Sequence, residues 1–265
     1  MNVILGAYSV TCIFPMIWLL YSSLKSNTQF LRSTFSLPLR PTFGNYATAF
    51  ASDIGTFMIN SLRNTALSVV LILFLSFISG YFLARFRFRL RNSIYAYFLL
   101  GMLIPVYALL VPMFVQLRSL HLLDQWYTLL LPYVGFGLPI GVVLAESFIR
   151  GIPREFEEVA AIDGSGFSRT LFTIMLPLTS PVLAAIAIIQ SFAVWNEFPF
   201  ALVLITSQRL MTVPVGLATS FRTLHFTDYT GMMAGIVTTM IPVMILYFIF
   251  SNRIIKGMTA GAIKG

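Results

Sequence analysis

The sequence predicts an all-α membrane protein, because of its composition, its long apolar runs and the placement of its charges. Of the 265 residues, 58% are hydrophobic and only 10% are charged, and the mean hydropathy is +0.87. Soluble proteins average roughly 25% charged residues. A spanning helix needs about 20 apolar residues, so a chain of this length can hold six spans with modest loops. We therefore predict a single transmembrane domain over residues 1–265.

Six apolar runs define the expected spans. The first run is too long for a cleaved signal peptide and lacks the basic start that such a peptide has, so it is retained as a span. Proline residues interrupt the third and fourth runs, where neighbouring helices can satisfy the freed carbonyl groups. A polar loop, residues 25–60, separates the first two runs. The expected spans cover residues 3–24, 62–84, 94–117, 128–149, 181–205 and 229–250.

Basic residues indicate which side of the membrane each loop occupies. The loop RFRFRLR, residues 85–91, has four Arg and no acidic residue, and the positive-inside rule places it in the cytoplasm. The tail after residue 250 is also basic, with Arg253, Lys256 and Lys264. Both termini are therefore expected in the cytoplasm. The net charge of +8 suits a basic face against anionic lipid better than nucleic acid binding.

The segment of residues 150–180 holds four of the nine acidic residues in an otherwise apolar chain. Three Glu residues follow Pro153, and carboxylates favour the first turns of a helix. We predict a helix over residues 153–163, about 16 Å long, which ends at Gly164 in a turn with positive φ. Ser165 is expected to cap a second helix that ends at Pro177. Pro181 is expected to begin the fifth span.

This segment carries a specific motif. It fits the pattern E-A-A-x3-G-x9-I-x-L-P, the EAA motif, with Val159 in place of the first Ala as the single departure. The loop resembles the cytoplasmic loop of permease subunits of bacterial ATP-binding-cassette (ABC) importers. The segment PTFGNYATAF and the tail resemble maltose or multiple-sugar permeases of the shorter, second-subunit kind. The matching loop residues are Glu158, Ala160, Gly164, Ile174, Leu176 and Pro177, and the matching tail residues are Ile254 or Ile255, Gly257, Gly261, Ala262, Lys264 and Gly265.

The resemblance implies a type I importer permease of the MetI-like kind, with six transmembrane helices and a cytoplasmic coupling helix. It implies partners too: a second permease in a heterodimer, two ATPase subunits and an extracellular or periplasmic binding protein. The protein would lie in the bacterial cell membrane. Glu158 either contacts the ATPase or only favours the helix N-terminus, and Asp163 either contacts it or caps the next turn. The expected coupling residues are Phe156, Glu158, Val159, Ala160, Asp163 and Gly164.

The sequence argues against an enzyme. No phosphate-binding G-x-x-x-x-G-K-[ST] loop occurs, and GSGFSRT lacks its Lys, so we expect ATP and Mg²⁺ on the partner ATPase and no cofactor on this chain. His121 and His225 lie in separate loops without neighbouring Cys or clustered carboxylates, so no metal site is expected. Cys12 lies alone in the first span.

Polar residues in the fifth span are the expected substrate contacts. A carboxylate at membrane depth is expensive unless it is paired or wetted, which favours a water-filled cavity. The amides could instead bond a neighbouring helix. Glu146, outside this group, is expected to pair with Arg150, and the absence of mid-membrane Lys or Arg favours a neutral oligosaccharide. The candidates are Gln190, Ser191, Trp195, Asn196 and Glu197.

Two other transport functions remain open from the sequence. An ion-coupled secondary carrier would use Glu197 as its proton-coupling carboxylate and would need no cytoplasmic helix pair. An ABC permease for glycerol phosphate would keep the coupling helix and change only the substrate. A scaffold or receptor subunit is disfavoured, because it leaves Glu197 without a role.

Overall fold

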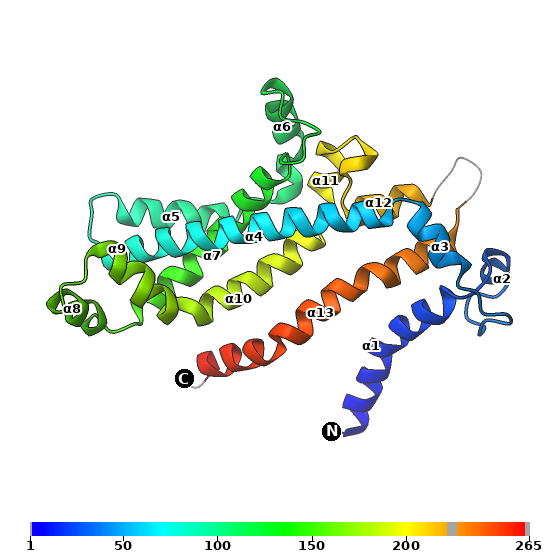
Figure 1. Ribbon diagram of the computed structural model, residues 1–265, viewed down its shortest axis with the longest axis horizontal. Helices are drawn as coiled ribbons and strands as arrows, with labels where there is room; N and C mark the ends of the chain where they lie inside the picture. The colour runs from blue at the N-terminus through cyan, green and yellow to red at the C-terminus, as the bar shows by residue number, and fades with distance from the viewer. Residues whose placement is uncertain (1, 222–226, 263–265) are drawn as a thin grey trace. The chain divides into compact units, whose positions relative to one another are not determined.

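The computed structural model describes residues 2–221 and 227–262, and it is helical in nearly every element (Figure 1). The contacts divide the chain into two compact units, residues 1–61 with 206–246 and residues 62–205 with 247–265. The helices are α1 Asn2–Ser22, α2 Asn27–Arg32, α3 Gly44–Ala51, α4 Ile54–Arg85, α5 Arg91–Gly101, α6 Val106–Ser119, α7 Leu130–Arg150, α8 Glu155–Ile162, α9 Phe167–Arg169, η1 Thr170–Met175, α10 Leu176–Trp195, α11 Pro199–Leu204, η2 Gln208–Leu210, α12 Val213–Ser220 and α13 Tyr229–Ala262.

The first unit has a small core of its own. Ala49, Ile54, Phe221 and Ala234 are buried together. Nearby, the ammonium of Lys25 is enclosed, because its Nζ donates to the Thr34 carbonyl at 2.8 Å and lies 5.0 Å from the centre of the Tyr21 ring. Burial lowers the pKa of Lys25, since a low-dielectric environment disfavours the charged form.

Helix α4 begins at Ile54, inside the stretch that was expected to be a polar loop. Two polar side chains explain why a helix is stable there. Asn60 donates to the Arg209 carbonyl at 2.8 Å, and the Ser61 hydroxyl accepts from the Val213 amide at 2.8 Å. Because these groups find partners in residues 209–213, far along the chain, their polarity does not end the helix. Tertiary contact therefore overrides the loop prediction.

The second unit is built on α4, α5, α7 and α10. Helix α7 packs against both α5 and α10, and these helices run beside one another in Figure 1. The core of this unit includes Ile72 and Phe77 of α4, Ile149 of α7 and Met175 of η1, all nearly or fully inaccessible. This core extends to the base of α8, so the acidic segment is attached to the bundle.

Small residues allow α4 and α7 to approach closely. A β-carbon at Gly137 would overlap Ile72, one at Gly141 would overlap Ser76, and one at Gly80 would lie 2.8 Å from the Ala145 β-carbon. Gly137 and Gly141 are four residues apart and lie on one face of α7. Small residues at this spacing are typical of tight helix pairs in membranes.

The third expected span is broken. Helices α5 and α6 are separated by a bend of 102° at residues 102–105, where Pro105 precedes α6. Pro112 lies inside α6 without ending it. In the described part of the chain, four helices are long and apolar enough to cross a membrane, or five if the bent pair is one span. The apolar part of α13, Tyr229–Ile245, is shorter.

The fifth helix differs most from the prediction. We expected Pro177 to end one helix and Pro181 to begin another, but α9, η1 and α10 form a continuous run from Phe167 to Trp195. The reason is a π-helical turn, Thr170–Met175, which precedes Pro177. Its i→i+5 pattern changes the hydrogen-bond register just where Pro177 lacks an N–H.

Some predicted residues cannot be compared with the structure. His225 of the loop before α13, and Lys264 and Gly265 of the tail motif, lie outside the described residues. The backbone of α13 continues as a helix to Ala262, beyond the expected end of the sixth span.

Candidate coupling surface and internal cavity

The acidic segment contains the predicted short helix. Helix α8 spans eight residues, or about 12 Å, and three Glu residues occupy its first turn. It ends in a Schellman motif, in which the Gly164 amide donates to Ala161 and the Ser165 amide to Ala160. Gly164 has φ +77°, which confirms the predicted positive-φ turn. The capping prediction for Ser165 is wrong, because the N-cap position of the next helix is occupied by Gly166 and no side chain caps that helix.

Helix α8 presents an apolar surface to its surroundings. Phe156 is 47% exposed, Val159 56% and Ile162 84%. The interpretation of Ala160 as part of the same face is not supported, since Ala160 is 4% exposed and faces the chain's own core, where α8 packs on η1. Sequence reasoning missed Ile162, although its spacing of three residues from Val159 indicated a shared stripe. Phe156, Val159 and Ile162 are called the α8 apolar stripe below.

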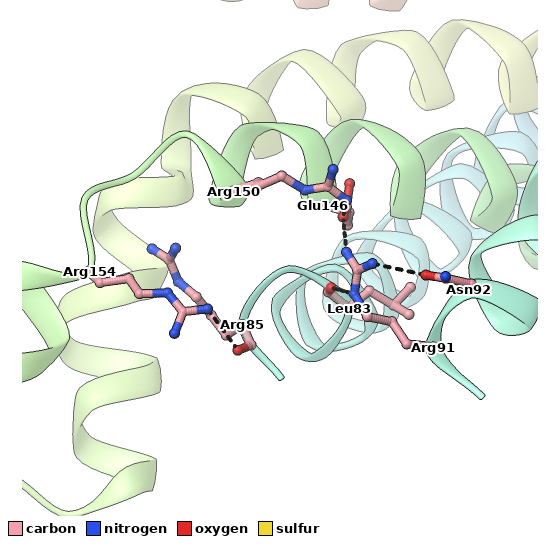
Figure 2. Close-up of polar contacts among 7 residues, drawn as sticks. All are labelled: Leu83, Arg85, Arg91, Asn92, Glu146, Arg150 and Arg154. Carbon is pink, nitrogen blue, oxygen red and sulfur yellow. Dashed lines mark hydrogen bonds and ion pairs between the residues drawn. The ribbon is translucent and has the colours of Figure 1, made fainter. Parts of the chain in front are cut away.

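A buried charged group attaches α8 to the end of α4. Glu157 is paired with Arg85, whose Nε lies 2.8 Å from Oε2, and the Tyr81 hydroxyl donates to Oε1 at 2.5 Å. Arg85 also donates from Nη2 to the Ile152 carbonyl at 2.8 Å, and Arg154 donates to the Arg85 carbonyl at 3.2 Å. Figure 2 shows Arg85 and Arg154 side by side. These contacts, called the α4–α8 clamp below, were not predicted, because Glu157 is outside the EAA motif.

A hollow of about 540 Å³ lies beside the clamp, at the link between α7 and α8. Arg150 and Arg154 line it together with Glu155 and Glu158, so it offers both signs of charge. Glu158 and Asp163 are exposed, as the sequence-based coupling role requires. Whether Glu158 contacts the ATPase or only favours the helix N-terminus, and whether Asp163 contacts the ATPase or caps the next turn, remain predictions.

A second charged cluster lies at the C-terminal end of α7. The carboxylate of Glu146 is 1% exposed and accepts from Arg150, four residues along the helix, which confirms the predicted pair. Arg91 also reaches the same oxygen, at 3.1 Å, and its Nε donates to the Leu83 carbonyl at 2.7 Å. Figure 2 shows Arg91 between Glu146 and Asn92. This cluster holds the start of α5 against α7.

The expected substrate region borders a cavity of about 330 Å³ within the second unit. Gln190 and Glu197 line it, together with Tyr133, Gly137 and mostly apolar side chains. Gln190 is buried and donates to the Gly137 carbonyl at 3.3 Å. Among the described residues, no Lys or Arg lines this cavity.

Glu197 does not lie in the middle of a helix, as the predicted span had it. It follows Asn196, the C-cap of α10, and its carboxylate accepts from the amides of Phe200 at 2.7 Å and Ala201 at 3.1 Å. The Tyr133 hydroxyl donates to it at 2.9 Å. These three donors satisfy the Glu197 carboxylate, which thereby bridges α7 and the start of α11.

The remaining candidates lie around the cavity without lining it. Trp195 is 5% exposed and packs in the core, and Asn196 is exposed and donates to the Phe192 carbonyl at 2.9 Å. Ser191 is half-buried. The described residues contain no group of three or more His, Cys, Asp or Glu that could hold a metal ion.

Long apolar helices, an internal cavity and a short acidic helix with an exposed apolar stripe indicate a membrane transport component. The family of binding-protein-dependent transport system inner membrane components matches residues 72–260. The chain belongs to this family, which comprises the permease subunits of ABC importers. The matched range includes α8, the clamp and the cavity.

Alignments with named sugar-transport relatives cover almost the whole chain. The chain is 37% identical to the diacetylchitobiose uptake system permease protein of Streptomyces coelicolor, over 99% of the chain and 88% of the relative. It is 32% identical to the trehalose/maltose transport system permease protein of Thermococcus litoralis, over 99% and 96%. It is similar in fold to a chain of a bacterial ABC transporter that imports the acidic polysaccharide alginate, with TM-score 0.81, 24% identity and coverage of 95% and 94%.

Proposed function

We propose that the chain is the permease subunit of an ATP-driven importer of neutral oligosaccharides. The observation that carries the proposal is the family match, together with sugar-transport relatives that align along nearly the full chain. The cavity is suited to an uncharged ligand, because its walls are mostly apolar, no Lys or Arg of the described residues lines it, and its one carboxylate, Glu197, is already engaged by Tyr133 and two backbone amides. Sugars need hydrogen-bond partners for hydroxyl groups and apolar surface for ring faces.

The assembly that we propose follows the importer class. A second permease completes the pathway, two ATPase subunits bind ATP and Mg²⁺, and a binding protein delivers the sugar. This chain hydrolyses nothing itself and binds no cofactor. It crosses the bacterial cell membrane six times, with α1, the bent α5–α6 pair and α13 each counted as one span, and both termini lie in the cytoplasm.

The α8 apolar stripe is the surface that we assign to the ATPase. An exposed apolar surface on a charged cytoplasmic segment is typical of an interaction site. Glu158 and Asp163 border it, and Gly164 sets the direction in which the chain leaves. Closing of the ATPase dimer on ATP moves the two coupling helices, and the permeases alternate between inward and outward access.

The test uses the chain co-expressed with a second permease, an ATPase and a binding protein of the proposed importer. In proteoliposomes, we expect uptake of radiolabelled neutral disaccharides and trisaccharides that requires both ATP and the binding protein. Acidic oligosaccharides and glycerol phosphate should not be taken up. Uptake driven by a proton gradient without ATP would instead establish the secondary carrier.

One substitution tests the ATPase contact separately. Val159→Asp places a charge in the α8 apolar stripe and should abolish co-purification of the ATPase, because an unpaired carboxylate would be buried at the contact. Leu31→Asp is the matched control, since Leu31 is 60% exposed on α2 and lies outside the α8 segment. Equal ATPase recovery with both variants would refute the assignment of the stripe.

A further inference from the structure

The α4–α8 clamp suggests how movement of α8 reaches the cavity. Arg85 is 6% exposed and Glu157 18% in their side chains, and Tyr81 is 4% exposed overall. An ion pair that is largely removed from water is screened little by salt and resists separation. Two backbone contacts reinforce it, from Arg85 to Ile152 and from Arg154 back to Arg85. The end of α4 therefore holds both helix α8, through Glu157, and the link before it, through Ile152 and Arg154.

From the clamp, α4 runs directly to the wall of the cavity. Tyr81 and Arg85 are at its C-terminal end, and Ile72 lies about two and a half turns before Tyr81 on the same helix. Ile72 packs at Gly137 so closely that a β-carbon there would overlap it. Gly137 lines the cavity, and its carbonyl accepts from Gln190. An unbroken helix therefore connects the coupling segment to a polar wall residue.

We infer that Glu157 is a positioning residue that makes α8 and α4 move as one rigid body, so that α4 carries the ATPase stroke to the cavity wall at Gly137. The inference rests on the proposed function for the direction of the stroke. Its structural part, the rigid attachment, stands on the clamp alone. Glu157 contacts neither substrate nor ATPase in this mechanism and acts through Arg85 and Tyr81.

The attachment is tested by a distance measurement in the assembled complex. Spin labels at Leu75→Cys on α4 and Ala161→Cys on α8 occupy exposed positions outside the α8 apolar stripe, in a Cys12→Ser background. Pulsed electron paramagnetic resonance should give one narrow distance, the same without nucleotide and with ATP trapped. Glu157→Gln should broaden it. Two results would overturn the inference. One is a label distance that differs between the nucleotide-free and ATP-trapped complexes when Glu157 is present; the other is a distance distribution that Glu157→Gln leaves unchanged.

The functional consequence is tested by ATP hydrolysis. Glu157→Gln should lower sugar-stimulated ATPase activity about tenfold, within the usual range for coupling between sites, while the ATPase subunit still co-purifies. The exchanged pair Arg85→Glu with Glu157→Arg should recover part of the stimulation, which a general folding defect would not. Glu155→Gln is the matched control, because Glu155 is exposed, lies two residues before Glu157 on another face of α8, and is outside the clamp. Normal sugar stimulation of ATP hydrolysis in the Glu157→Gln variant would show that the clamp does not transmit the movement of α8 to α4.

The two experiments separate the inference from the proposed function. If no sugar stimulates ATP hydrolysis in the unaltered complex, the proposed function fails, and the distance measurement still decides whether α8 and α4 form one body. If stimulation is normal but the labelled distance changes with ATP, the importer stands and the rigid attachment falls.

Discussion

At the scale of single residues, buried charges are held by several partners. Glu146 shows this most fully, since Arg91 and Arg150 both reach one oxygen of a carboxylate that is 1% exposed. The sequence predicted the Arg150 pair from its spacing of four residues on one helix. It could not predict Arg91, which is 55 positions away and is brought close only by packing of α5 on α7.

Glu146→Gln should therefore destabilise the protein markedly. The substitution leaves two guanidinium groups without a carboxylate, and loss of one member of a buried ion pair destabilises by about 3 kcal/mol. The unfolding temperature of the detergent-solubilised protein should fall. Arg150→Gln should have a much smaller effect, because the Arg150 side chain is 56% exposed and Arg91 still neutralises Glu146. Similar losses for the two variants would contradict the shared role of Arg91.

Gly164 gives a second prediction at this scale. A β-carbon there meets nothing within 4 Å, so the only penalty for Gly164→Ala is the positive φ of +77°. That conformation disfavours a residue with a side chain by about 1–2 kcal/mol. Gly166→Ala is a close control, since it is also open to solvent but has φ −70°. Protease cleavage between α8 and α9 should increase for Gly164→Ala alone; equal cleavage in both would argue against backbone strain.

At the scale of elements, prediction succeeded where local chemistry decides and failed where distant contacts do. Helix α8 and its Gly164 turn follow from acidic residues, a motif and a residue that tolerates positive φ. The start of α4 does not, because Asn60 and Ser61 are compatible with a helix only through partners near residue 210. Pro177 was misread for a related reason, since a π-helical turn next to a proline has no simple sequence pattern.

The same reasoning explains what was missed at the cavity. Gln190 and Glu197 were identified by their rarity in an apolar segment, and both line the cavity. Tyr133 was not identified, because tyrosine is common in apolar runs and only the structure shows that its hydroxyl donates to Glu197. Of the candidates, Trp195 proved to be a core residue, which its large apolar ring makes the more common role.

The α4–α7 contact provides the prediction for this scale. Gly141→Ala should push the helices apart, because the new methyl group would overlap the Ser76 hydroxyl, and overpacking of this kind destabilises by about 1–3 kcal/mol. Gly135→Ala, on the same helix with nothing within 4 Å, should be neutral or slightly stabilising.

A second substitution identifies the cause. The Ser76 hydroxyl is buried without a hydrogen-bond partner among the described atoms, so Ser76→Ala alone should change stability little. Combined with Gly141→Ala, it should recover most of the loss in unfolding temperature, because the overlapping atom has been removed. Simple additivity of the two changes would argue against a direct contact.

At the scale of the whole molecule, the number of membrane crossings depends on the bent α5–α6 pair. The sequence predicts six crossings, but α5 and α6 are short helices separated by a 102° bend. If the pair crosses the membrane, the links before and after it lie on opposite sides. If it re-enters, both links lie on the same side. The basic loop of residues 85–91 and the loop of residues 120–129 therefore report on the topology.

Cysteine labelling distinguishes these topologies in intact cells. In a Cys12→Ser background, we place single cysteines at Phe88, His121, Leu39 and Ile162, all exposed in the structure. A membrane-impermeant maleimide should label Leu39→Cys and His121→Cys from outside, and Phe88→Cys and Ile162→Cys only after permeabilisation. Labelling of His121→Cys only from inside would make the α5–α6 pair re-entrant. Because the α8 apolar stripe must meet the ATPase, labelling of Ile162→Cys from outside would refute the importer itself.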